Sequence, residues 1–331
     1  MDHPRPSDEV PFVTCNHCGM GLPEPARFCS RCGFPLEPDE RSAAQRLSEH
    51  LGADFHVMGE LGRGGFAVVY LVEDRKAKRH LAVKVMRREL MIAPLLVERF
   101  RREIRLASKL DHPNIIPVTF SAERGDFVYY AMPRVKGDSL KEHLQKEKQL
   151  SIQHTLQILR DLAAALTHAH EREVVHRDIK PSNVMLEKSG AAKILDFGLA
   201  RALSPDGGTL SISGEIIGSP QYLSPEQAAG EKHLDHRCDI YNWGILGYEM
   251  LTGEPPFSGR TLHEVLHKHV TQTPEPITKS RSDAPAPVVS VLERALEKDR
   301  EDRWQAMGDA IAELDAMLPA RELKGVDRSG R

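Results

Sequence analysis

Hydrophobic and polar positions first alternate along the chain and later recur with a helical period. Between residues 55 and 86, three runs rich in β-forming residues alternate in this way: FHVMGEL, FAVVYLVED and HLAVKVM. A period of two predicts three antiparallel strands joined by turns. Residues 95–110 place apolar side chains at helical spacing, and residues 118–133 predict two more strands. A small β-rich part with one helix therefore precedes the rest of the chain.

Helical periods dominate the remainder. Residues 151–171 carry apolar side chains on one face, which predicts a long amphipathic helix. Further helices are predicted at 224–230, 237–252, 261–270, 286–297 and 305–318. The expected fold class is α+β, in which a small antiparallel sheet with one helix is followed by a larger, mainly helical part.

The two ends of the chain differ from this middle part. Residues 1–36 hold too little apolar content to bury a core, and the charged residues 37–54 predict a linker with some helical tendency. The main domain is expected at 55–318, and residues 319–331 are expected to form a disordered tail.

Composition and charge narrow the class of protein. A chain of 331 residues is long enough for one large domain with an appendage. The net charge of −3 creates no global positive field, so nucleic acid is not favoured as a partner. The first residues lack the apolar core of a signal peptide, and no apolar run approaches the roughly 18 residues that a spanning helix needs. We expect a cytoplasmic protein without membrane insertion.

The stretch LGRGGFAVVY, residues 61–70, contains a glycine-rich loop. Gly62 and Gly64 open a G-x-G-x-x-G-like pattern in which Ala67 stands at the third glycine. Such a loop can hold a dinucleotide pyrophosphate or the phosphates of ATP, and a plain hairpin turn would look similar. A β-type run follows this loop instead of a helix, and Lys84 stands near the offset where a dinucleotide site needs an acidic residue. A lysine there suits phosphate binding.

Further motifs follow in a fixed order along the chain. They are Lys84, Glu103, HRDIKPSN at 176–183, DFG at 196–198, SPE at 224–226, Asp239 and Arg303. In this order and spacing they resemble a eukaryotic-type protein Ser/Thr kinase, in the form found in bacteria, over about residues 55–318. The resemblance implies a bilobal kinase fold with an N-lobe and hinge at 55–135 and a C-lobe at 136–318. It implies transfer of the ATP γ-phosphate to Ser/Thr hydroxyls of protein substrates.

The resemblance also assigns roles to the catalytic residues. Lys84 would neutralise the α- and β-phosphates of ATP, held by a carboxylate for which Glu103 is the first candidate and Glu98 the second. Asp178 would orient the substrate hydroxyl and accept its proton. Lys180 would stabilise the charge on the γ-phosphate, and a lysine at this place is typical of the Ser/Thr class.

Cofactor binding follows from the same resemblance. Asp196 and Asn183 would each hold a Mg²⁺ ion. Met132 would be the gatekeeper beside adenine, Pro133 would offer a hinge carbonyl, and Val135 would offer the hinge N–H that adenine accepts. The full set expected to bind ATP is Leu61, Gly62, Arg63, Gly64, Gly65, Phe66, Val69, Ala82, Lys84, Met132, Pro133, Val135 and Met185.

Four residues of the motifs are expected to support the site without touching substrate. His176 would bond backbone near the DFG motif, and Asp239 would hold the backbone of the catalytic loop. Glu226 and Arg303 are expected to form a buried ion pair in the helical part.

The activation segment, residues 196–226, carries candidate phosphorylation sites. Arg177 precedes Asp178, as in kinases whose activation segment is ordered by a phosphate. We hypothesise that Thr209, Ser211 or Ser213 is autophosphorylated; a polar loop without phosphate is the alternative. Ser219 stands where the family usually has threonine, and its hydroxyl can still bridge Asp178 and Lys180.

Four of the five cysteines are crowded together near the N-terminus. Cys15, Cys18, Cys29 and Cys32 form C-x2-C-x10-C-x2-C, in which a glycine follows each pair. This pattern favours a tetrahedral Cys₄ zinc site and resembles the short zinc-ribbon modules of bacterial proteins. Rubredoxin-like iron and a disulfide pair are the lesser alternatives. The module should fold only with metal. Protein docking or substrate recruitment is the favoured role, and Cys238 is expected to be a buried small residue.

Two other functions remain open from the sequence. One is a scaffold without catalysis that binds nucleotide and partners, although Lys84, Glu103, Asp178, Asn183 and Asp196 are all present. The other is a regulator in which the zinc ribbon binds nucleic acid, for which Arg27 and Arg31 are a small positive charge.

Overall fold

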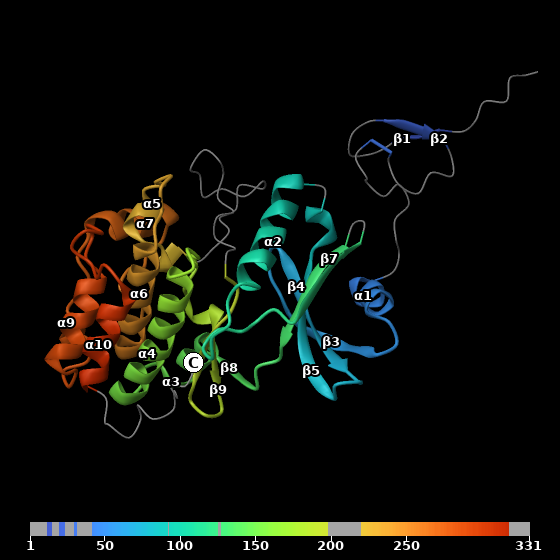
Figure 1. Ribbon diagram of the computed structural model, residues 1–331. Coiled ribbons are helices and arrows are strands. Elements are labelled where there is room, and N and C mark those ends of the chain that lie inside the picture. Colours follow the sequence, from blue (N-terminus) through green and yellow to red (C-terminus); the bar gives the residue numbers. More distant parts are fainter. Residues whose placement is uncertain are drawn as a thin grey trace, which may run out of the picture. The chain divides into compact units, whose positions relative to one another are not determined.

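The computed structural model of the protein describes residues 12–14, 20–23, 30–31, 42–91, 93–124, 127–197 and 220–317. The chain divides into two compact units (Figure 1). The sheet unit comprises residues 1–98 and 119–134, and the helical unit comprises residues 99–118 and 135–331. The predicted α+β class, with a small antiparallel sheet and a larger helical part, is confirmed.

The sheet unit contains a five-stranded antiparallel sheet in the order β3-β4-β5-β7-β6. Its strands are β3 (Phe55–Arg63), β4 (Ala67–Asp74), β5 (Arg79–Met86), β6 (Phe120–Arg124) and β7 (Phe127–Pro133). The alternating runs of the sequence therefore form the strands predicted from them. A 3₁₀ turn, η1 (Arg88–Leu90), and helix α2 (Pro94–Ala107) follow β5.

One face of this sheet is covered by a helix that the sequence indicated only as a tendency. Helix α1 (Ala43–Leu51) begins at Ser42, whose side chain accepts from the Gln45 N–H while the Gln45 side chain accepts from the Ser42 N–H. This capping box satisfies two N-terminal donors. Leu47 is fully buried among the strands, and the His50 ring stacks on Phe127 with a centroid separation of 4.9 Å. The segment expected as a linker thus contributes to the core.

The helical unit contains eight helices within the described residues. They are α3 (Leu140–Glu147), α4 (Ile152–His170), α5 (Pro225–Ala228), α6 (Arg237–Thr252), α7 (Leu262–Thr271), α8 (Ile277–Ser280), α9 (Ala286–Ala295) and α10 (Met307–Met317). Helices α4, α5, α6, α7, α9 and α10 match the predicted segments, whereas the short α3 and α8 were not predicted.

Short irregular elements link these helices. Strands β8 (Gly137–Ser139), β9 (Val184–Glu187) and β10 (Ala192–Ile194) form a small antiparallel sheet in the order β10-β9-β8, which was not predicted either. Two 3₁₀ turns, η2 (Pro181–Asn183) and η4 (Pro220–Tyr222), precede β9 and α5. Three-residue strands and turns of one helical period carry too few positions for a hydrophobic period to register.

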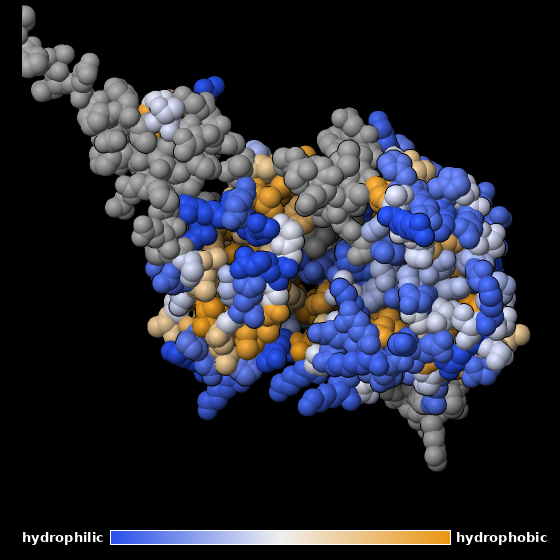
Figure 2. Space-filling view, turned by 180° about the vertical axis from the view of Figure 1, so that it is seen from behind, coloured by the Kyte–Doolittle hydropathy of each residue, from blue (hydrophilic) through white to orange (hydrophobic). Residues whose placement is uncertain are grey.

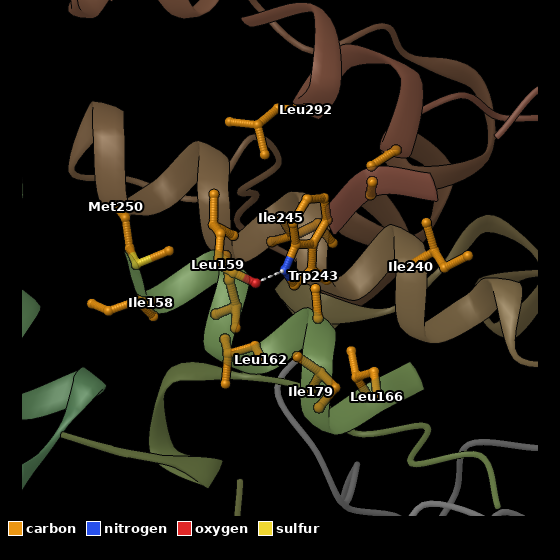
Figure 3. Packing of buried hydrophobic residues seen from close by; sticks show 14 of the residues in the cluster. Ile158, Leu159, Leu162, Leu166, Ile179, Ile240, Trp243, Ile245, Met250 and Leu292 are labelled. Atoms are coloured by element: carbon orange, nitrogen blue, oxygen red, sulfur yellow. Dashed lines mark hydrogen bonds between the residues drawn. The ribbon is translucent and has the colours of Figure 1, made fainter. Parts of the chain in front are cut away.

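The core of the helical unit lies around α4 and α6. Trp243 of α6 is fully buried, and its Nε1–H donates to the Leu159 carbonyl of α4 at 2.9 Å (Figure 3). A Cβ atom at Gly247 would lie 2.3 Å from Leu292 Cδ2, so glycine lets α9 pack closely on α6. On the face that Figure 2 shows, this unit presents mainly hydrophilic residues around that apolar interior.

Near the N-terminus, strands β1 (Phe12–Thr14) and β2 (Gly21–Pro23) form an antiparallel hairpin. In this hairpin Val13 pairs with Leu22. All four clustered cysteines lie outside the described residues, as do Thr209, Ser211, Ser213, Ser219 and the tail 319–331.

The length and apolar character of the helices bear on whether any of them could span a membrane. None of those in the described ranges is long and apolar enough to cross a membrane.

Candidate active site

The loop that follows α4 brings three predicted catalytic side chains together. Lys180 Nζ lies 2.7 Å from Asp178 Oδ2. Asn183 Nδ2 donates to the same Oδ2 at 3.0 Å and to the Asp178 backbone carbonyl at 2.8 Å. Both of these side-chain contacts use Oδ2, so Oδ1 is the oxygen available to a further donor. Asp178, Lys180 and Asn183 thus form one hydrogen-bonded cluster.

Asp239 of α6 holds the backbone of this loop, as predicted. Its Oδ2 accepts from the His176 N–H at 2.8 Å, and its Oδ1 accepts from the Arg177 N–H at 2.6 Å. Arg177 has a φ of 68°, a left-handed conformation that is costly for a residue with a side chain. His170 Nε2 lies 2.8 Å from Oδ2. Burial alone would raise the pKa of Asp239, but the bond and charge of His170 hold that pKa below its ordinary value.

His176 bonds the backbone next to the DFG motif, which confirms its predicted role. The Asp178 N–H donates to His176 Nδ1 at 3.2 Å, so the ring proton sits on Nε2. That Nε2–H donates to the Leu195 carbonyl at 2.8 Å, and the Leu195 N–H donates to the Asn183 carbonyl at 2.9 Å. The residue before Asp196 is therefore fixed on both sides to the catalytic loop.

Asp196 and Asn183 have the donor types that suit a magnesium ion. Asp196 has a φ of 60°, a left-handed conformation that in a non-glycine residue marks a constrained position. Both donor contacts of the Asn183 amide go to Asp178, which leaves its Oδ1 as the atom for a cation. A carboxylate and an amide oxygen are the hard ligands that Mg²⁺ prefers.

Four of the residues predicted to bind ATP share one face of the five-stranded sheet: Val69, Ala82, Lys84 and Met132. Val69, Lys84 and Tyr130 lie opposite one another on β4, β5 and β7, and Ala82 pairs with Met132 two residues along. Side chains on one strand alternate between the faces. This row therefore faces away from Leu47 and α1. Lys84 is 5% exposed, and its Nζ lies 5.7 Å from the centroid of the Tyr130 ring.

The glycine loop closes the β3–β4 hairpin, and Ala67 is the first residue of β4, as predicted. The Gly64 N–H donates to the Ala67 carbonyl at 2.9 Å. The Gly64 amide is therefore used inside the turn, which holds the loop in its hairpin shape. A Cβ atom at Gly62 or Gly65 would meet no atom within 4 Å, so internal packing does not require glycine there. That open space is what a bound phosphate needs.

Four other residues predicted to bind ATP lie in the sheet unit. Arg63 forms a 2.6 Å ion pair with Glu60 on β3, and Pro133 ends β7, where Leu81 is its partner. Leu61 is 46% exposed on β3, and Phe66 accepts at its carbonyl from the Arg87 N–H.

Val135 is the residue at which the chain enters the helical unit after Arg134, and Met185 pairs with Lys193 in the small sheet. Glu103 of α2 is fully buried, whereas Glu98 is exposed. This burial favours Glu103 over Glu98 as the carboxylate for Lys84, and the pairing itself stays a prediction.

Glu226 and Arg303 form the predicted buried ion pair. Arg303 Nη1 and Nη2 donate to the two carboxylate oxygens of Glu226 at 2.9 and 2.8 Å, and Arg303 is fully buried. Burial alone would raise the pKa of Glu226, but the Arg303 bonds hold it below the ordinary value. Two parallel hydrogen bonds restrict both the distance and the orientation between two side chains. The ion pair therefore holds Glu226, and with it α5, against the segment that carries Arg303.

Sequence reasoning missed a second set of contacts around η4. Tyr222 Oη donates to the Glu249 carboxylate at 2.9 Å, and Asn242 Nδ2 donates to the Tyr222 carbonyl at 2.5 Å. Gln227 Nε2 donates to the Arg177 carbonyl at 2.9 Å. The only sequence signal for them was the presence of polar residues within the apolar pattern of α6.

Comparison with known proteins places these residues in a family context. The family described as protein kinase domain matches residues 55–312, and the family described as zinc-ribbon domain matches residues 14–36.

Three relatives illustrate the similarity. Serine/threonine-protein kinase PknB of Mycolicibacterium smegmatis is 38% identical over 271 residues, which are 80% of this chain and 43% of the relative. PknB of Mycobacterium tuberculosis is 37% identical over 267 residues, 79% of this chain and 42% of the relative. A probable serine/threonine-protein kinase of Streptomyces coelicolor is 38% identical over 274 residues, 81% of this chain and 40% of the relative. The chain thus spans about two fifths of the length of these relatives.

Proposed function

Because the chain belongs to the protein kinase family, we propose that it transfers the γ-phosphate of ATP to serine or threonine hydroxyls of protein substrates. The observation that carries the proposal is the cluster of Asp178, Lys180 and Asn183, in which one carboxylate oxygen is held by two donors. The names of the relatives support serine or threonine as the acceptor.

The proposed step uses Asp178 as the group that receives the substrate proton. The acceptor hydroxyl donates to Asp178 Oδ1, the oxygen left by the Lys180 and Asn183 contacts, and its oxygen attacks the γ-phosphorus in line with the leaving ADP oxygen. Lys180 is tied to Asp178 at 2.7 Å, and it lies where its ammonium can neutralise charge on the transferred phosphoryl group. The proton goes to Asp178 as the new P–O bond forms and the bond to ADP breaks.

ATP and magnesium binding are part of the same proposal. Asp196 and the amide oxygen of Asn183 would hold Mg²⁺, which would supply positive charge to neutralise the phosphates when bound. The face of the sheet that carries Val69, Ala82, Lys84 and Met132 would hold adenine and the first phosphates, with Glu103 as the partner of Lys84.

Regulation and the zinc ribbon extend the proposal beyond catalysis. We propose autophosphorylation at Thr209, Ser211 or Ser213, supported by the arginine that precedes Asp178. We propose that Cys15, Cys18, Cys29 and Cys32 hold zinc, supported by the zinc-ribbon match at residues 14–36. A protein partner or substrate would dock on this ribbon.

Phosphate transfer from radiolabelled ATP to a generic basic protein tests the function. The wild-type chain should label the substrate, and Asp178→Asn and Asp196→Asn should each lower the rate at least a hundredfold. The matched control is Asp302→Asn, which changes an exposed aspartate in the loop before α10. Wild-type rates in Asp196→Asn would refute the catalytic assignment. Binding of ATP by the wild type without transfer would instead support the scaffold alternative.

Mass spectrometry of the chain expressed alone tests the regulation. Phosphate on Thr209, Ser211 or Ser213 is expected in the wild type and not in Asp178→Asn. An active wild-type protein without phosphate at these three residues would contradict autophosphorylation.

A further inference from the structure

A small pocket lies beside the last turns of α6, away from the catalytic cluster. Helices α6 and α9 pack side by side (Figure 1), and the pocket lies where Tyr248 of α6 meets the end of α9 and the segment 273–277. Its volume is about 260 Å³. Pockets that hold a drug-sized molecule measure roughly 300–1,000 Å³, so this space suits a single side chain.

The walls of this pocket are apolar and stiff. Ile277 and Leu296 line it and are both buried. Pro274 and Pro276 stand on either side of Glu275. Proline fixes its own φ and pushes the residue before it toward an extended conformation, so the backbone around Glu275 has little freedom. A pocket whose walls are fixed before binding loses little conformational entropy when it is filled.

Tyr248 contributes a hydroxyl that lacks a protein partner. The residue is 6% exposed, and its hydroxyl makes no hydrogen bond to any residue in the described part of the chain. The oxygen is still reached by solvent, so it opens into the pocket that the side chain lines. The hydroxyl of a buried tyrosine usually finds a hydrogen-bond partner, and this one can both donate and accept. The group is therefore available to a ligand in the pocket.

Three carboxylates surround the same space, those of Glu275, Glu293 and Glu297. All three side chains are exposed. Glu275 pairs with Lys279, whereas Glu293 and Glu297 form no ion pair with a residue that the structure describes. Both stand at the C-terminal end of α9, where the negative end of the helix dipole disfavours a carboxylate. A bound cation would relieve this unfavourable placement.

Lys298 is the only cation among the described residues that line the pocket, and it is engaged elsewhere. Its Nζ donates to Tyr241 Oη at 3.1 Å and to the His269 carbonyl at 2.9 Å. The same Nζ lies 4.2 Å from the centroid of the Phe257 ring. These contacts hold the ammonium group inside the helical unit. The carboxylates around the pocket therefore keep their negative charge.

We propose that this pocket binds an arginine side chain from a basic segment of a protein partner. The aliphatic stem packs on the apolar walls, and the guanidinium group donates to the Tyr248 hydroxyl and to the carboxylates of Glu293 and Glu297. A planar group with five donors fits a hydroxyl and two carboxylates better than the compact, strongly hydrated ammonium of lysine does. The site is separate from the proposed kinase activity, so its tests do not require phosphate transfer.

Methyl NMR of the full chain tests the pocket directly. The probe is a blocked peptide that carries one arginine between glycine and serine residues. Its titration should shift the methyl signals of Ile277 and Leu296, with a Kd on the order of 1 mM. The same peptide with citrulline, which has the shape of arginine without the charge, should bind at least about tenfold more weakly. Equal binding of the two peptides would overturn the proposal.

Variants of the lining residues test the assigned groups. Tyr248→Phe should weaken binding of the arginine peptide about fivefold, and Glu293→Gln combined with Glu297→Gln about tenfold. The control is Glu313→Gln, which changes an exposed glutamate of α10 and should bind like the wild type. Unchanged binding in both Tyr248→Phe and the double variant would overturn the proposal.

The double variant also separates binding from folding. Its urea midpoint should be no lower than that of the wild type, because the charges that it removes stand at the negative end of α9. Weaker binding together with an undiminished midpoint supports a role in binding. A lowered midpoint would show that the carboxylates are structural and would overturn the proposal.

Two further measurements identify the source of the cation. Putrescine, a free diammonium compound, should bind at least about threefold more weakly than the arginine peptide. Tighter binding of putrescine would overturn the assignment to a protein side chain. In sedimentation without peptide, the wild type and the double variant should show the same mass. Self-association that the double variant loses would assign the pocket to a second copy of this chain and overturn the assignment to a separate partner.

Discussion

Replacement of Asp239 by asparagine is the sharpest test of how the helical unit shapes the catalytic loop. The carboxylate is fully buried and accepts two backbone N–H groups, from His176 at Oδ2 and from Arg177 at Oδ1. Asparagine has the same shape but only one acceptor oxygen. In either orientation of the amide, one backbone N–H therefore points at an NH₂ group instead of an oxygen.

The magnitude follows from the bonds that are lost. A hydrogen bond to a charged group contributes about 1.5–3 kcal/mol, and a buried donor left without an acceptor costs about 1–3 kcal/mol. Relief of the cost of burying the Asp239 charge offsets part of this sum. We expect Asp239→Asn to lower the free energy of unfolding by about 3 kcal/mol.

The loop would also lose what holds it in shape. The left-handed conformation of Arg177, with φ of 68°, costs about 1–2 kcal/mol and is retained by the bond to Asp239. Once released, the residue should relax and displace the adjacent Asp178. A displacement of about 1 Å can lower kcat by on the order of a hundredfold.

Urea unfolding and kcat are measured together, with the exposed substitution Asp302→Asn as control. A loss of less than about 1 kcal/mol together with a wild-type kcat would refute the reasoning. The free energy of unfolding measured at acid pH provides a second check. Because the folded-state pKa of Asp239 is lowered, its contribution to stability is present above the unfolded pKa and lost as the pH falls. That loss should be missing from the asparagine variant.

Other predictions concern stability. Leu47→Ala should lower the free energy of unfolding in urea by about 2–4 kcal/mol, because it leaves a cavity at a buried site. The control Ser48→Ala, on the exposed face of α1, should change this free energy by under about 0.5 kcal/mol. Equal effects of the two substitutions would contradict the packing of α1. Burial and Glu254 raise the pKa of Glu249 to about 7 from an ordinary 4.5, so its stabilising effect is complete below pH 4.5 and falls as the pH rises to 7. Urea midpoints measured from pH 4.5 to 8 should therefore show a loss of about 3 kcal/mol that Glu249→Gln lacks. Arg303→Met should cost about 3–5 kcal/mol by thermal or urea unfolding, and adding Glu226→Gln should recover part of it; purely additive costs would show that the two side chains do not interact.

The local pattern of the sequence was sufficient for most elements of regular structure. Runs of β-forming residues over 55–86 and 118–133 predicted the strands of the five-stranded sheet. Most positions of β4 alternate between buried and half-buried, whereas β5 and β7 are buried on both faces along most of their length, so residue type was the stronger signal for them. Helical periods located α2 and α4 within a few residues. Elements of three or four residues, such as β8 and α8, were missed because they contain fewer than two repeats of their own period.

Motif order predicted which residues are candidates for catalysis, and it said less about the groups that they contact. Asp178, Lys180 and Asn183 lie within six residues of one another, so their proximity was predictable, and the structure adds that both donors use the same oxygen. The bond from the Gly64 amide to the Ala67 carbonyl was not predictable, because only the fold of the turn shows it.

The sequence by itself determined the strands, the long helices and the list of chemical groups at the site, since these depend on residue type and short-range spacing. Only the tertiary structure decided that α1 completes the core of the sheet unit and that α7 packs on η4. It also decided which backbone groups Asp239 holds, 62 and 63 residues away in sequence. The physical reason is that burial and hydrogen bonding depend on which distant segments meet, and a hydrophobic period says which face of an element is buried without naming the segment that covers it.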